Sequence, residues 1–314
     1  MDGDIAPALL ARFEAAFDRF QLNGKLGLAV SGGPDSMALL ALAHDLLGDA
    51  IEVATVDHGL RAEAAEECAL VARVCSDRGI PCRLLNVSVD EGNVQDRARA
   101  ARYAALGKWA QARELAAIAT AHHTDDQAET LLMRLNRGSG LAGLAGIRSS
   151  TMIAGCAVPV LRPLLAFRKQ ELRDLVERLG TPFAEDPSNR DQSYDRVRIR
   201  RALEAADWID PMALARSASH LEEAEQALEI VADQLWDDAA VIGDARVAVP
   251  VGPTRDTSAR LVARAIAILG GEISHGEVAA FLKAADRRGN IAGVLVERRG
   301  DRFICTPEPP RRSG

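Results

Sequence analysis

The chain carries a short turn-forming stretch, Ser31-Gly32-Gly33-Pro34-Asp35-Ser36, directly after an apolar run over residues 26–30. Helix-forming residues follow from Met37 to Leu42. We therefore predict a strand, a tight turn and a helix in succession. The two glycines let the backbone approach a ligand closely, and the fixed φ of Pro34 suits a first helical turn. The free N–H groups of that turn, with the helix dipole behind them, form a site for an anion such as phosphate.

An ordinary turn with a helix cap is the alternative interpretation, because Ser, Gly, Pro and Asp are common in any turn. The lysine of a Walker-type loop is absent, which excludes that motif. Ser31 and Ser36 add hydroxyl donors, and Asp35 could hold a metal ion that bridges phosphate oxygens. After a first strand, this pattern resembles the pyrophosphate loop of N-type ATP pyrophosphatases, which cut ATP between its α and β phosphates.

The composition limits the class of protein. The chain has 314 residues, a net charge of −7 and five scattered cysteines without a C-x-x-C pair. The negative charge argues against indiscriminate coating of nucleic acid, and the cysteine pattern argues against a zinc ribbon or a disulfide framework. Residues 1–20 lack the apolar core of a signal peptide, and no stretch is apolar for long enough to cross a bilayer. We expect a cytoplasmic protein without membrane association.

Strands and helices alternate after the first loop. We predict strands at residues 51–56, 82–87 and 115–121, and helices at 62–78, 96–115 and 124–135. This order predicts an α/β fold with a doubly wound, mainly parallel sheet. Residues 158–165 contain two prolines and are expected to form an edge strand or an extended crossing segment.

A boundary is expected near residue 207. We assign residues 1–207 to a catalytic domain and residues 208–314 to a helical linker and a smaller, mostly helical C-terminal domain. The linker is a long helix over residues 212–238, and two shorter helices are expected near 258–269 and 276–285. A strand at residues 247–251 and a hairpin of strands 291–297 and 302–306 complete this part.

Polar clusters follow the predicted strands, at the sheet edge where ligands bind in such folds. The second strand ends in Asp57-His58-Gly59-Leu60-Arg61, and the fourth in His122-His123-Thr124-Asp125-Asp126, with Glu129 one helical turn on. Each cluster alone is typical of an ordinary turn or helix cap. Their occurrence together on one edge of the predicted sheet favours a ligand-binding site. Histidine and carboxylate together could hold zinc or iron. Adjacent histidines on an extended segment point to opposite faces, however, which favours Mg²⁺ carried by a nucleotide.

Arginines are the third signal. Arg99 and Arg102 share a helical face on which they could bind a substrate with several phosphates, although a solvated face is the plain alternative. Arg137 begins a basic, glycine-rich loop. The best local candidates for nucleic-acid phosphate contacts are Arg190, Arg196, Arg198, Arg200 and Arg201.

Taken together, these segments resemble the tRNA(Ile)-lysidine synthases, and the resemblance is dense from about residue 26 to residue 201. The block from His122 to Leu141 is its most specific part. The segments are Ser31 to Ser36, Asp57 to Arg61, Ala98-Arg99-x-x-Arg102-Tyr103, His122-His123-x-Asp125-Asp126-Gln127-Ala128-Glu129-Thr130, Arg137-Gly138-Ser139-Gly140-Leu141 and Glu185-Asp186-Pro187-Ser188-Asn189.

The resemblance implies a fold like that of the adenine nucleotide alpha hydrolases and an ATP-dependent ligase. Such an enzyme adenylates C2 of the wobble cytidine in the CAU anticodon of tRNA(Ile), and the ε-amine of free L-lysine then displaces AMP. It implies Mg²⁺ near Asp35 and catalytic roles for Asp35, Arg102 and Asp126. Asp126 and Glu129, three residues apart on one helical face, are expected to bind lysine. The implied ATP site comprises Ser31, Gly32, Gly33, Pro34, Asp35, Ser36, His58 and Arg61.

The sequence also allows expectations about binding partners and about alternative functions. The C-terminal part is expected to contact tRNA, and a homodimer is allowed. A tRNA-thiolating enzyme of the same fold would need paired catalytic cysteines or an iron–sulfur cluster, and the cysteine spacing argues against both. Amide-forming synthetases usually bring an additional amidotransferase or dimerising domain, which we do not find in the sequence. A tRNA-binding module without catalysis is a third alternative, but it would not need Asp35, Asp125, Asp126 and Glu129.

Overall fold

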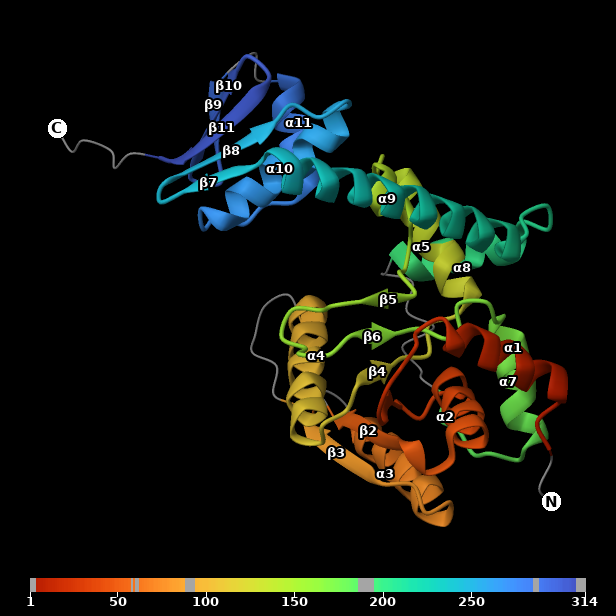
Figure 1. The fold of residues 1–314 in the computed structure, drawn as a ribbon. Coiled ribbons are helices and arrows are strands. Elements are labelled where there is room, and N and C mark those ends of the chain that lie inside the picture. Colours follow the sequence, from red (N-terminus) through yellow and green to blue (C-terminus); the bar gives the residue numbers. More distant parts are fainter. Residues whose placement is uncertain are drawn as a thin grey trace. The chain divides into compact units, whose positions relative to one another are not determined.

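The chain forms two compact units in a computed structural model, which describes residues 4–57, 59, 62–87, 94–185, 195–284 and 288–308 (Figure 1). The N-terminal unit comprises residues 1–139 and 144–219, and the C-terminal unit comprises residues 140–143 and 220–314. The two units therefore divide inside the long helix α9 (Pro211–Ala239), whereas the expected boundary at residues 207–208 lies just before this helix.

A six-stranded sheet forms the centre of the N-terminal unit, in the order β3-β2-β1-β4-β6-β5. All neighbouring strands are parallel except β5, which runs antiparallel to β6 at the edge. The predicted mainly parallel α/β sheet is confirmed. The strands are β1 (Leu26–Ala29), β2 (Ile51–Asp57), β3 (Cys82–Asn86), β4 (Ala117–Ala119), β5 (Ser150–Thr151) and β6 (Val160–Leu161).

The segment at residues 158–165 was expected to form an edge strand or an extended crossing segment, and the edge position is wrong. β6 pairs with β4 on one side and with β5 on the other. Pro159 and Pro163 flank the two-residue strand, so neither proline has to donate a ladder hydrogen bond.

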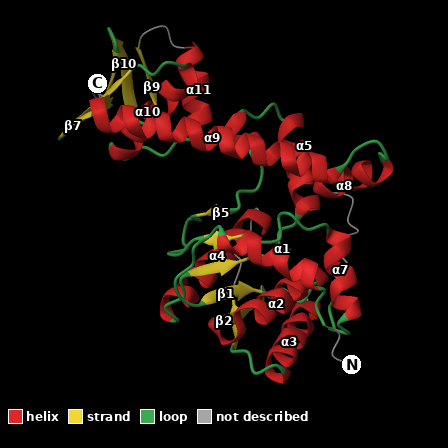
Figure 2. Ribbon diagram, turned by 45° about the vertical axis from the view of Figure 1, so that its right-hand side comes forward, coloured by secondary structure: helices red, strands yellow, loops and turns green. Residues whose placement is uncertain are grey.

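Helices cover both faces of the sheet, as Figures 1 and 2 show. Leu26, Leu28 and Val53 pack on one face with α1, α2, α3 and α7, whereas alternate residues such as Ala54 pack with α4 on the other face. Gly27 has a packing role there, because a Cβ at this position would lie 2.8 Å from the Trp109 ring of α4. The helices are α1 (Pro7–Asp18), α2 (Pro34–Leu47), the 3₁₀ turn η1 (Gly48–Ala50), α3 (Ala62–Asp77), α4 (Val94–Ala112), α5 (Thr124–Asn136), α7 (Lys169–Arg178) and α8 (Asp195–Ala205).

The C-terminal unit contains a five-stranded antiparallel sheet in the order β7-β8-β11-β10-β9. Two helices, α10 (Arg255–Ile268) and α11 (His275–Ala284), pack on it around a core that includes Val249, Val262 and Phe303. The short helix α6 (Leu141–Leu144) belongs almost wholly to this unit. The strands are β7 (Val241–Gly243), β8 (Arg246–Pro250), β9 (Arg288–Ile291), β10 (Val294–Arg299) and β11 (Arg302–Pro307).

The sheet of this unit is larger than the sequence predicted. The expected strand 291–297 is two strands, because the chain turns at Ala292 and Gly293, which have φ values of +51° and +74°. β7 was not predicted at all; its three residues are exposed. The hairpin around Gly300 is confirmed by the pairing of β10 with β11.

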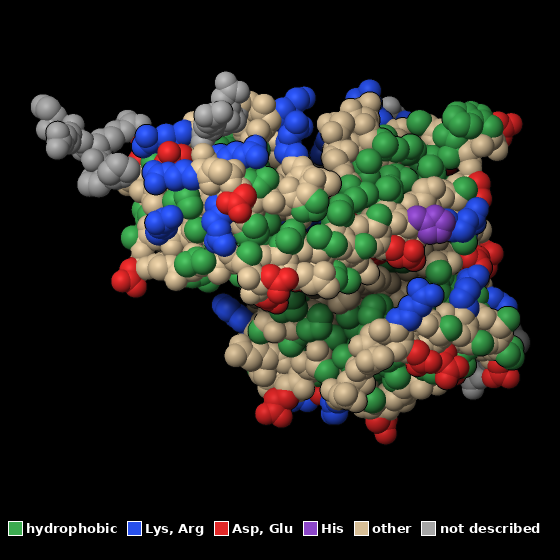
Figure 3. Space-filling view, turned by 45° about the horizontal axis from the view of Figure 1, so that its top comes forward, with side chains coloured by type: hydrophobic (Ala, Val, Ile, Leu, Met, Phe, Trp, Pro, Cys, Tyr) green, Lys and Arg blue, Asp and Glu red, His purple; other side chains and the backbone are tan. Residues whose placement is uncertain are grey.

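No helix in the described part of the chain combines the length and apolarity needed to span a membrane. On the face seen in Figure 3, Lys and Arg side chains are most frequent at the upper left, whereas Asp and Glu side chains are most frequent at the lower edge and on the right.

Candidate active site

The loop after β1 adopts the predicted strand–turn–helix geometry. Gly32 has φ +91°, which other residues rarely adopt, and Gly33 precedes Pro34 at the start of α2. The buried Ser36 hydroxyl organises the turn, since it accepts from the Ser31 N–H at 3.2 Å and donates to the Gly33 carbonyl at 2.9 Å. No described side chain caps this helix, so its first-turn N–H groups keep their capacity to bind an anion.

Asp35 lies in the first turn of α2 with one oxygen unsatisfied. Its Oδ1 is buried and has no hydrogen-bond partner among the described residues. Its Oδ2 lies 3.6 Å from Nε2 of His123. A buried carboxylate oxygen without a partner is costly, and such an atom is a candidate ligand for a cation.

A cavity of about 430 Å³ opens beside the loop at the carboxyl ends of β1, β2 and β4. Ligands occupy this position in open α/β sheets. The cavity is lined by Ala29, Val30, Ser31, Gly33, Asp35, Ser36, Ala54, Val56, Ala64, Glu67, Cys68, Arg102, Thr120, Ala121, His122, Asp126, Ala184 and Arg196.

Arg102 brings a positive charge to the cavity from α4. Its guanidinium carbon lies 5.2 Å from the centre of the Tyr103 ring. Its Nε is buried and makes no hydrogen bond within the described residues. The donor capacity of Arg102 is therefore incompletely used, which suits an anionic ligand.

His123 and Asp126 cap α5 reciprocally. Nδ1 of His123 accepts from the Asp126 N–H at 3.3 Å, and the Asp126 carboxylate accepts from the His123 N–H at 3.1 Å. Burial acts to lower the pKa of His123, but its contact with Asp35 and the charges of Asp126 and Asp125 outweigh burial and raise this pKa. The cap fixes Asp126 at the cavity edge.

His122 has the opposite electrostatic environment. Burial lowers the pKa of this imidazole to about 3, and the charges of nearby arginines, Arg162 foremost, add to the effect against the opposing charge of Asp126. Nδ1 of His122 lies 3.0 Å from the Thr120 hydroxyl. The ring that lines the cavity is therefore neutral at physiological pH.

Asp126 and Glu129 meet two arginines of α8. Arg196 spans both carboxylates, with 2.6 Å from Nη2 to Asp126 Oδ1 and 2.6 Å from Nε to Glu129 Oε2. Arg200 donates from Nε to Glu129 Oε1 at 2.6 Å. Burial acts to raise the pKa of Asp126, but the charges of His123 and Arg196 outweigh it and lower this pKa. We name Asp126, Glu129, Arg196 and Arg200 the cavity cluster.

The side chains of the adjacent residues Asp125 and Asp126 contact different parts of the structure. Asp125 accepts from the Lys169 N–H at 2.7 Å and pairs with Arg168 at 2.9 Å, so it binds the N-terminus of α7. Burial acts to raise its pKa, but the bonds from Arg168 and Lys169 outweigh burial and lower it. Only Asp126 of the pair lines the cavity. The two carboxylates therefore differ in their surroundings, a difference that the sequence left open.

Comparison with known proteins gives the family. A model of the PP-loop domain matches residues 7–206. The tRNA(Ile)-lysidine synthase of Novosphingobium aromaticivorans is 43% identical over 99% of this chain and 97% of its own. That of Zymomonas mobilis is 42% identical over 93% of this chain and 91% of its own. The chain belongs to the tRNA(Ile)-lysidine synthase family.

A solved structure also shares the fold. The U34-tRNA thiolase NcsA from Methanococcus maripaludis, determined with its [4Fe-4S] cluster, has a TM-score of 0.58 and 16% identity over 69% of this chain and 78% of its own. This likeness concerns the fold alone. All five cysteines of the present family member are free thiols, and no group of three or more potential metal-binding side chains occurs in the described ranges.

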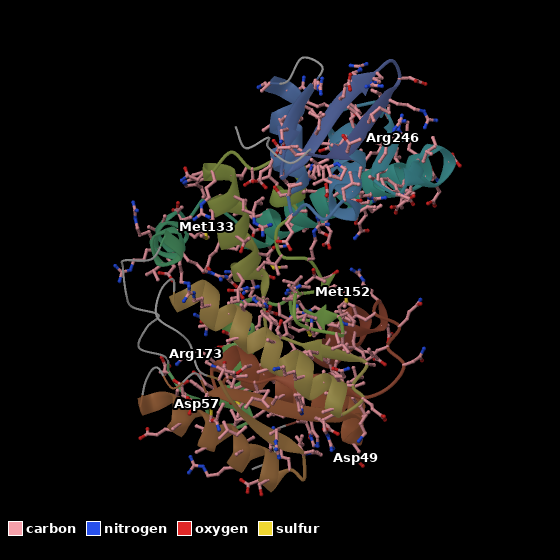
Figure 4. All side chains as sticks on the ribbon, turned by 90° about the vertical axis from the view of Figure 1, so that its left-hand side faces the viewer. Asp49, Asp57, Met133, Met152, Arg173 and Arg246 are labelled. Carbon is pink, nitrogen blue, oxygen red and sulfur yellow. The ribbon has the colours of Figure 1, made fainter. Side chains whose placement is uncertain are left out.

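Most residues expected from the lysidine synthase motifs gather around the cavity. Ser31, Gly33, Asp35, Ser36, Arg102 and Asp126 line it, and Gly32, Pro34 and Glu129 adjoin these residues in the loop, in α2 and in the cavity cluster. The family implies the use of ATP. His58, Arg61 and Arg190 lie outside the described residues. Asp57, labelled in Figure 4, accepts a hydrogen bond from the Gly59 N–H at 2.8 Å, as in an ordinary Asx turn.

The arginines expected to bind tRNA separate into two groups. Arg196 and Arg200 direct their guanidinium groups to carboxylates, which differs from the expected phosphate contact. Arg198 and Arg201 are exposed on α8, and Arg137 is exposed at the end of α5. Arg99 is also exposed, with its guanidinium 5.1 Å from the Tyr103 ring centre.

The structure adds lining residues that were not assigned to the site from the sequence. Cys68 of α3 lines the cavity and accepts a hydrogen bond from the Thr55 hydroxyl at 3.3 Å. Ala184 lines it too, and its N–H donates to the Gly32 carbonyl at 2.9 Å, which ties the segment after α7 to the loop. His122 was considered only as part of a possible zinc or iron site, which was ranked below Mg²⁺ carried by a nucleotide. The sequence could have placed His122 in the site because this residue directly follows a predicted strand. Cys68 and Ala184 have no comparable position in the sequence pattern.

Proposed function

We propose that this protein uses ATP to ligate free L-lysine to C2 of the wobble cytidine in the CAU anticodon of tRNA(Ile), which forms lysidine and releases AMP and pyrophosphate. Family membership supports the reaction class. The observation that carries the proposal is that the loop of residues 31–36 and Asp126 line one cavity, and that Arg196 joins Asp126 to the buried Glu129. The cavity would thus hold phosphates beside a carboxylate that can bind an ammonium group.

The loop residues suit the first step. Attack by the C2 oxygen of cytidine on the α-phosphorus expels pyrophosphate. The first-turn N–H groups of α2 would hold the leaving group, in a loop that the hydrogen-bonded Ser31 and Ser36 hydroxyls organise. Arg102 would stabilise charge on the phosphates or on the adenylate, because its Nε is free to donate within the described structure.

Mg²⁺ is part of this proposal. Asp35 would hold it, because its Oδ1 is buried and lacks a partner among the described residues, and Mg²⁺ commonly takes one carboxylate together with phosphate oxygens. When bound, the ion would neutralise charge on the phosphates.

The carboxylates suit the second step. The lysine ε-ammonium must lose a proton before its nitrogen can attack C2 and displace AMP. Asp126, with a lowered pKa, is a carboxylate at neutral pH that can bind the ammonium. We assign lysine binding to Asp126 and Glu129, and proton acceptance to Asp126 because it lines the cavity, whereas Glu129 is 2% exposed.

Contacts with tRNA are assigned to exposed arginines. Arg137, Arg198 and Arg201 are suited to phosphate contacts, and the C-terminal unit is a further candidate. Arg190 stays a prediction. We also propose a cytoplasmic location, and a homodimer stays a prediction.

Transfer of labelled lysine to tRNA tests the proposal. We expect ATP-dependent incorporation into tRNA(Ile) that survives mild alkaline deacylation, because the label is on a base and not on the terminal ribose. Substitution of the wobble cytidine by uridine should abolish incorporation. Pyrophosphate release that depends on tRNA, without any lysine incorporation, would contradict lysine as the nucleophile.

A further inference from the structure

Arg196 lies between two sites that the proposed reaction must fill together. Its side chain lines the 430 Å³ cavity beside the loop of residues 31–36. The same guanidinium bonds Asp126 and Glu129 at 2.6 Å each. Both carboxylates assigned to lysine are therefore already paired with a cation of the protein.

The cavity cluster leaves little room for another cation. Glu129 is 2% exposed, and Arg196 and Arg200 bond its two oxygens. Two carboxylates and two guanidinium groups sum to zero charge. A lysine ammonium that entered this neutral, partly buried group would gain little attraction and would be repelled by both guanidinium groups.

A nucleotide changes this balance because its phosphates offer Arg196 a second anionic partner. The side chain of Arg196 is 39% exposed and already reaches the cavity wall, so its guanidinium can turn without unfolding of α8. Guanidinium groups bind phosphate and carboxylate with the same bidentate geometry. Arg200, which does not line the cavity, would keep its bond with Glu129.

We propose that Arg196 is a positioning residue that exchanges Asp126 for the phosphates of a bound nucleotide and thereby makes the lysine site available only after the nucleotide site is filled. The inference rests on the proposed function, since it takes Asp126 and Glu129 as the lysine site. The two substrates then bind with positive coupling, which must be reciprocal. Lysine then binds only when the nucleotide whose AMP it will displace is already bound.

Calorimetric titration of lysine into the full chain tests the coupling. The titration is done with and without a saturating α,β-methylene analogue of ATP and Mg²⁺, which cannot be cleaved at the reacting bond. We expect the lysine Kd to fall by about tenfold or more with the analogue, in the ordinary range of allosteric coupling. Lysine should lower the Kd of the analogue by the same factor.

Arg196→Gln should remove the coupling, because glutamine is uncharged. Lysine should then bind the nucleotide-free variant more tightly than it binds the nucleotide-free wild type, and the analogue should bring no further gain. Arg216→Gln is the matched control, since Arg216 is an exposed helix arginine that pairs with Asp210 at 3.6 Å. This control should keep the wild-type coupling.

The outcomes separate the inference from the proposed function. Equal lysine affinity with and without the analogue in the wild type overturns the coupling, and this result needs no variant to fold. Unchanged coupling in Arg196→Gln overturns the role of Arg196. If lysine binds neither form of the wild type while the analogue binds normally, the lysine site itself is wrongly assigned, and the inference fails with it.

Discussion

Two arginine–carboxylate clusters in this protein use the same chemistry in different surroundings. In the cavity cluster, Arg196 joins Asp126 and Glu129 and is 39% exposed. In the C-terminal unit, Arg260 joins Glu225 of α9 and Asp256 of α10 and is 2% exposed. We name the second group, which also contains Glu229 and His275, the C-terminal cluster.

The difference lies in what surrounds each arginine. Arg260 donates to three carboxylates at once; its guanidinium and the Glu225 carboxylate are buried against each other, whereas Glu229 and Asp256 are partly exposed. Arg196 instead has one side on a cavity that a ligand can enter. An enclosed ion pair serves to fix α9 against α10, whereas an ion pair beside a cavity can exchange partners. The exposure of the central arginine, more than the residue types, distinguishes the two clusters.

Asp126→Asn, a change in the cavity cluster, should have the largest effect, and this effect should be on activity. We expect the rate of lysine transfer to fall by about 10²–10³-fold, since the side chain loses its charge and its ability to accept a proton. Folding should be retained, because asparagine can still accept the hydrogen bond from the His123 N–H. Single-turnover transfer of labelled lysine measures the loss, and tRNA-dependent pyrophosphate release should be largely retained.

Asp174→Asn is the control for this change, because Asp174 is on α7 and accepts an exposed hydrogen bond from Gln170. It should transfer lysine at the wild-type rate. Equal loss of pyrophosphate release and lysine transfer in Asp126→Asn would contradict a lysine-specific role.

Arg260→Met should have a smaller effect, and one on stability. Removal of the buried guanidinium leaves Glu225 without its partner, so we expect the free energy of unfolding to fall by about 3 kcal/mol. Urea unfolding monitored by Trp236, which packs against the core of the C-terminal unit, measures this loss.

Arg264→Met is the comparison for Arg260. Arg264 pairs with Glu229 and Asp233, but it is 31% exposed and both partners are more exposed still. The loss in the free energy of unfolding should therefore stay below about 1 kcal/mol. Equal losses in the two variants would mean that burial does not distinguish these ion pairs.

Ser36→Ala tests the loop beside the cavity cluster. Its hydroxyl bonds both Ser31 and Gly33, and its loss should cost about 1 kcal/mol of ATP binding, a rise of several-fold in the KM for ATP. Steady-state kinetics at saturating lysine and tRNA measure this change. Ser217→Ala, an exposed serine that donates to the Ala213 carbonyl within α9, should leave this KM unchanged. A fall in melting temperature without a change in KM would make Ser36 a purely structural residue.

Mild acid should distinguish the two regions by the pH dependence of their stability. The pKa of His122 is lowered to about 3, so the unfolded chain binds a proton below about pH 6.5 that the folded chain refuses. Stability of the N-terminal unit should therefore fall as pH drops from 6.5, by less than about 1.4 kcal/mol per pH unit. Burial acts to raise the pKa of Asp256, but the bonds from Arg260 and His275 outweigh it and lower this pKa. The stabilisation by Asp256 is thus lost only below about pH 3.8.

Urea midpoints between pH 7 and pH 4.5 measure this difference, with Trp109 reporting on the core of the N-terminal unit. His122→Asn should flatten the profile, whereas His220→Asn, a change at an exposed histidine of α9, should not. A profile that is equally steep in wild type and His122→Asn would show that other groups cause the acid sensitivity.

Much of the fold followed from local patterns. The parallel sheet was predicted because apolar runs of strand length alternate with segments of helical spacing, and the boundaries of α5 and α3 lie within a residue or two of those expected. The loop geometry was predicted because Gly32 and Pro34 have restricted or special backbone preferences of their own. The break between β9 and β10 was missed, since the turn places Ala292, which rarely adopts positive φ, beside a single glycine, Gly293.

The sequence by itself predicted which groups follow the strands at the carboxyl edge of the sheet, because the alternation of strands and helices along the chain and the phase of each helix depend mainly on neighbouring residues. Only the tertiary structure decided what those groups face. Asp125 and Asp126 are adjacent and chemically identical, yet one binds α7 and the other lines the cavity. Arg196 is 70 residues from Asp126 in sequence, and α8 brings their side chains to 2.6 Å. Contacts at such separations depend on how whole helices pack, and a local pattern holds no information about them.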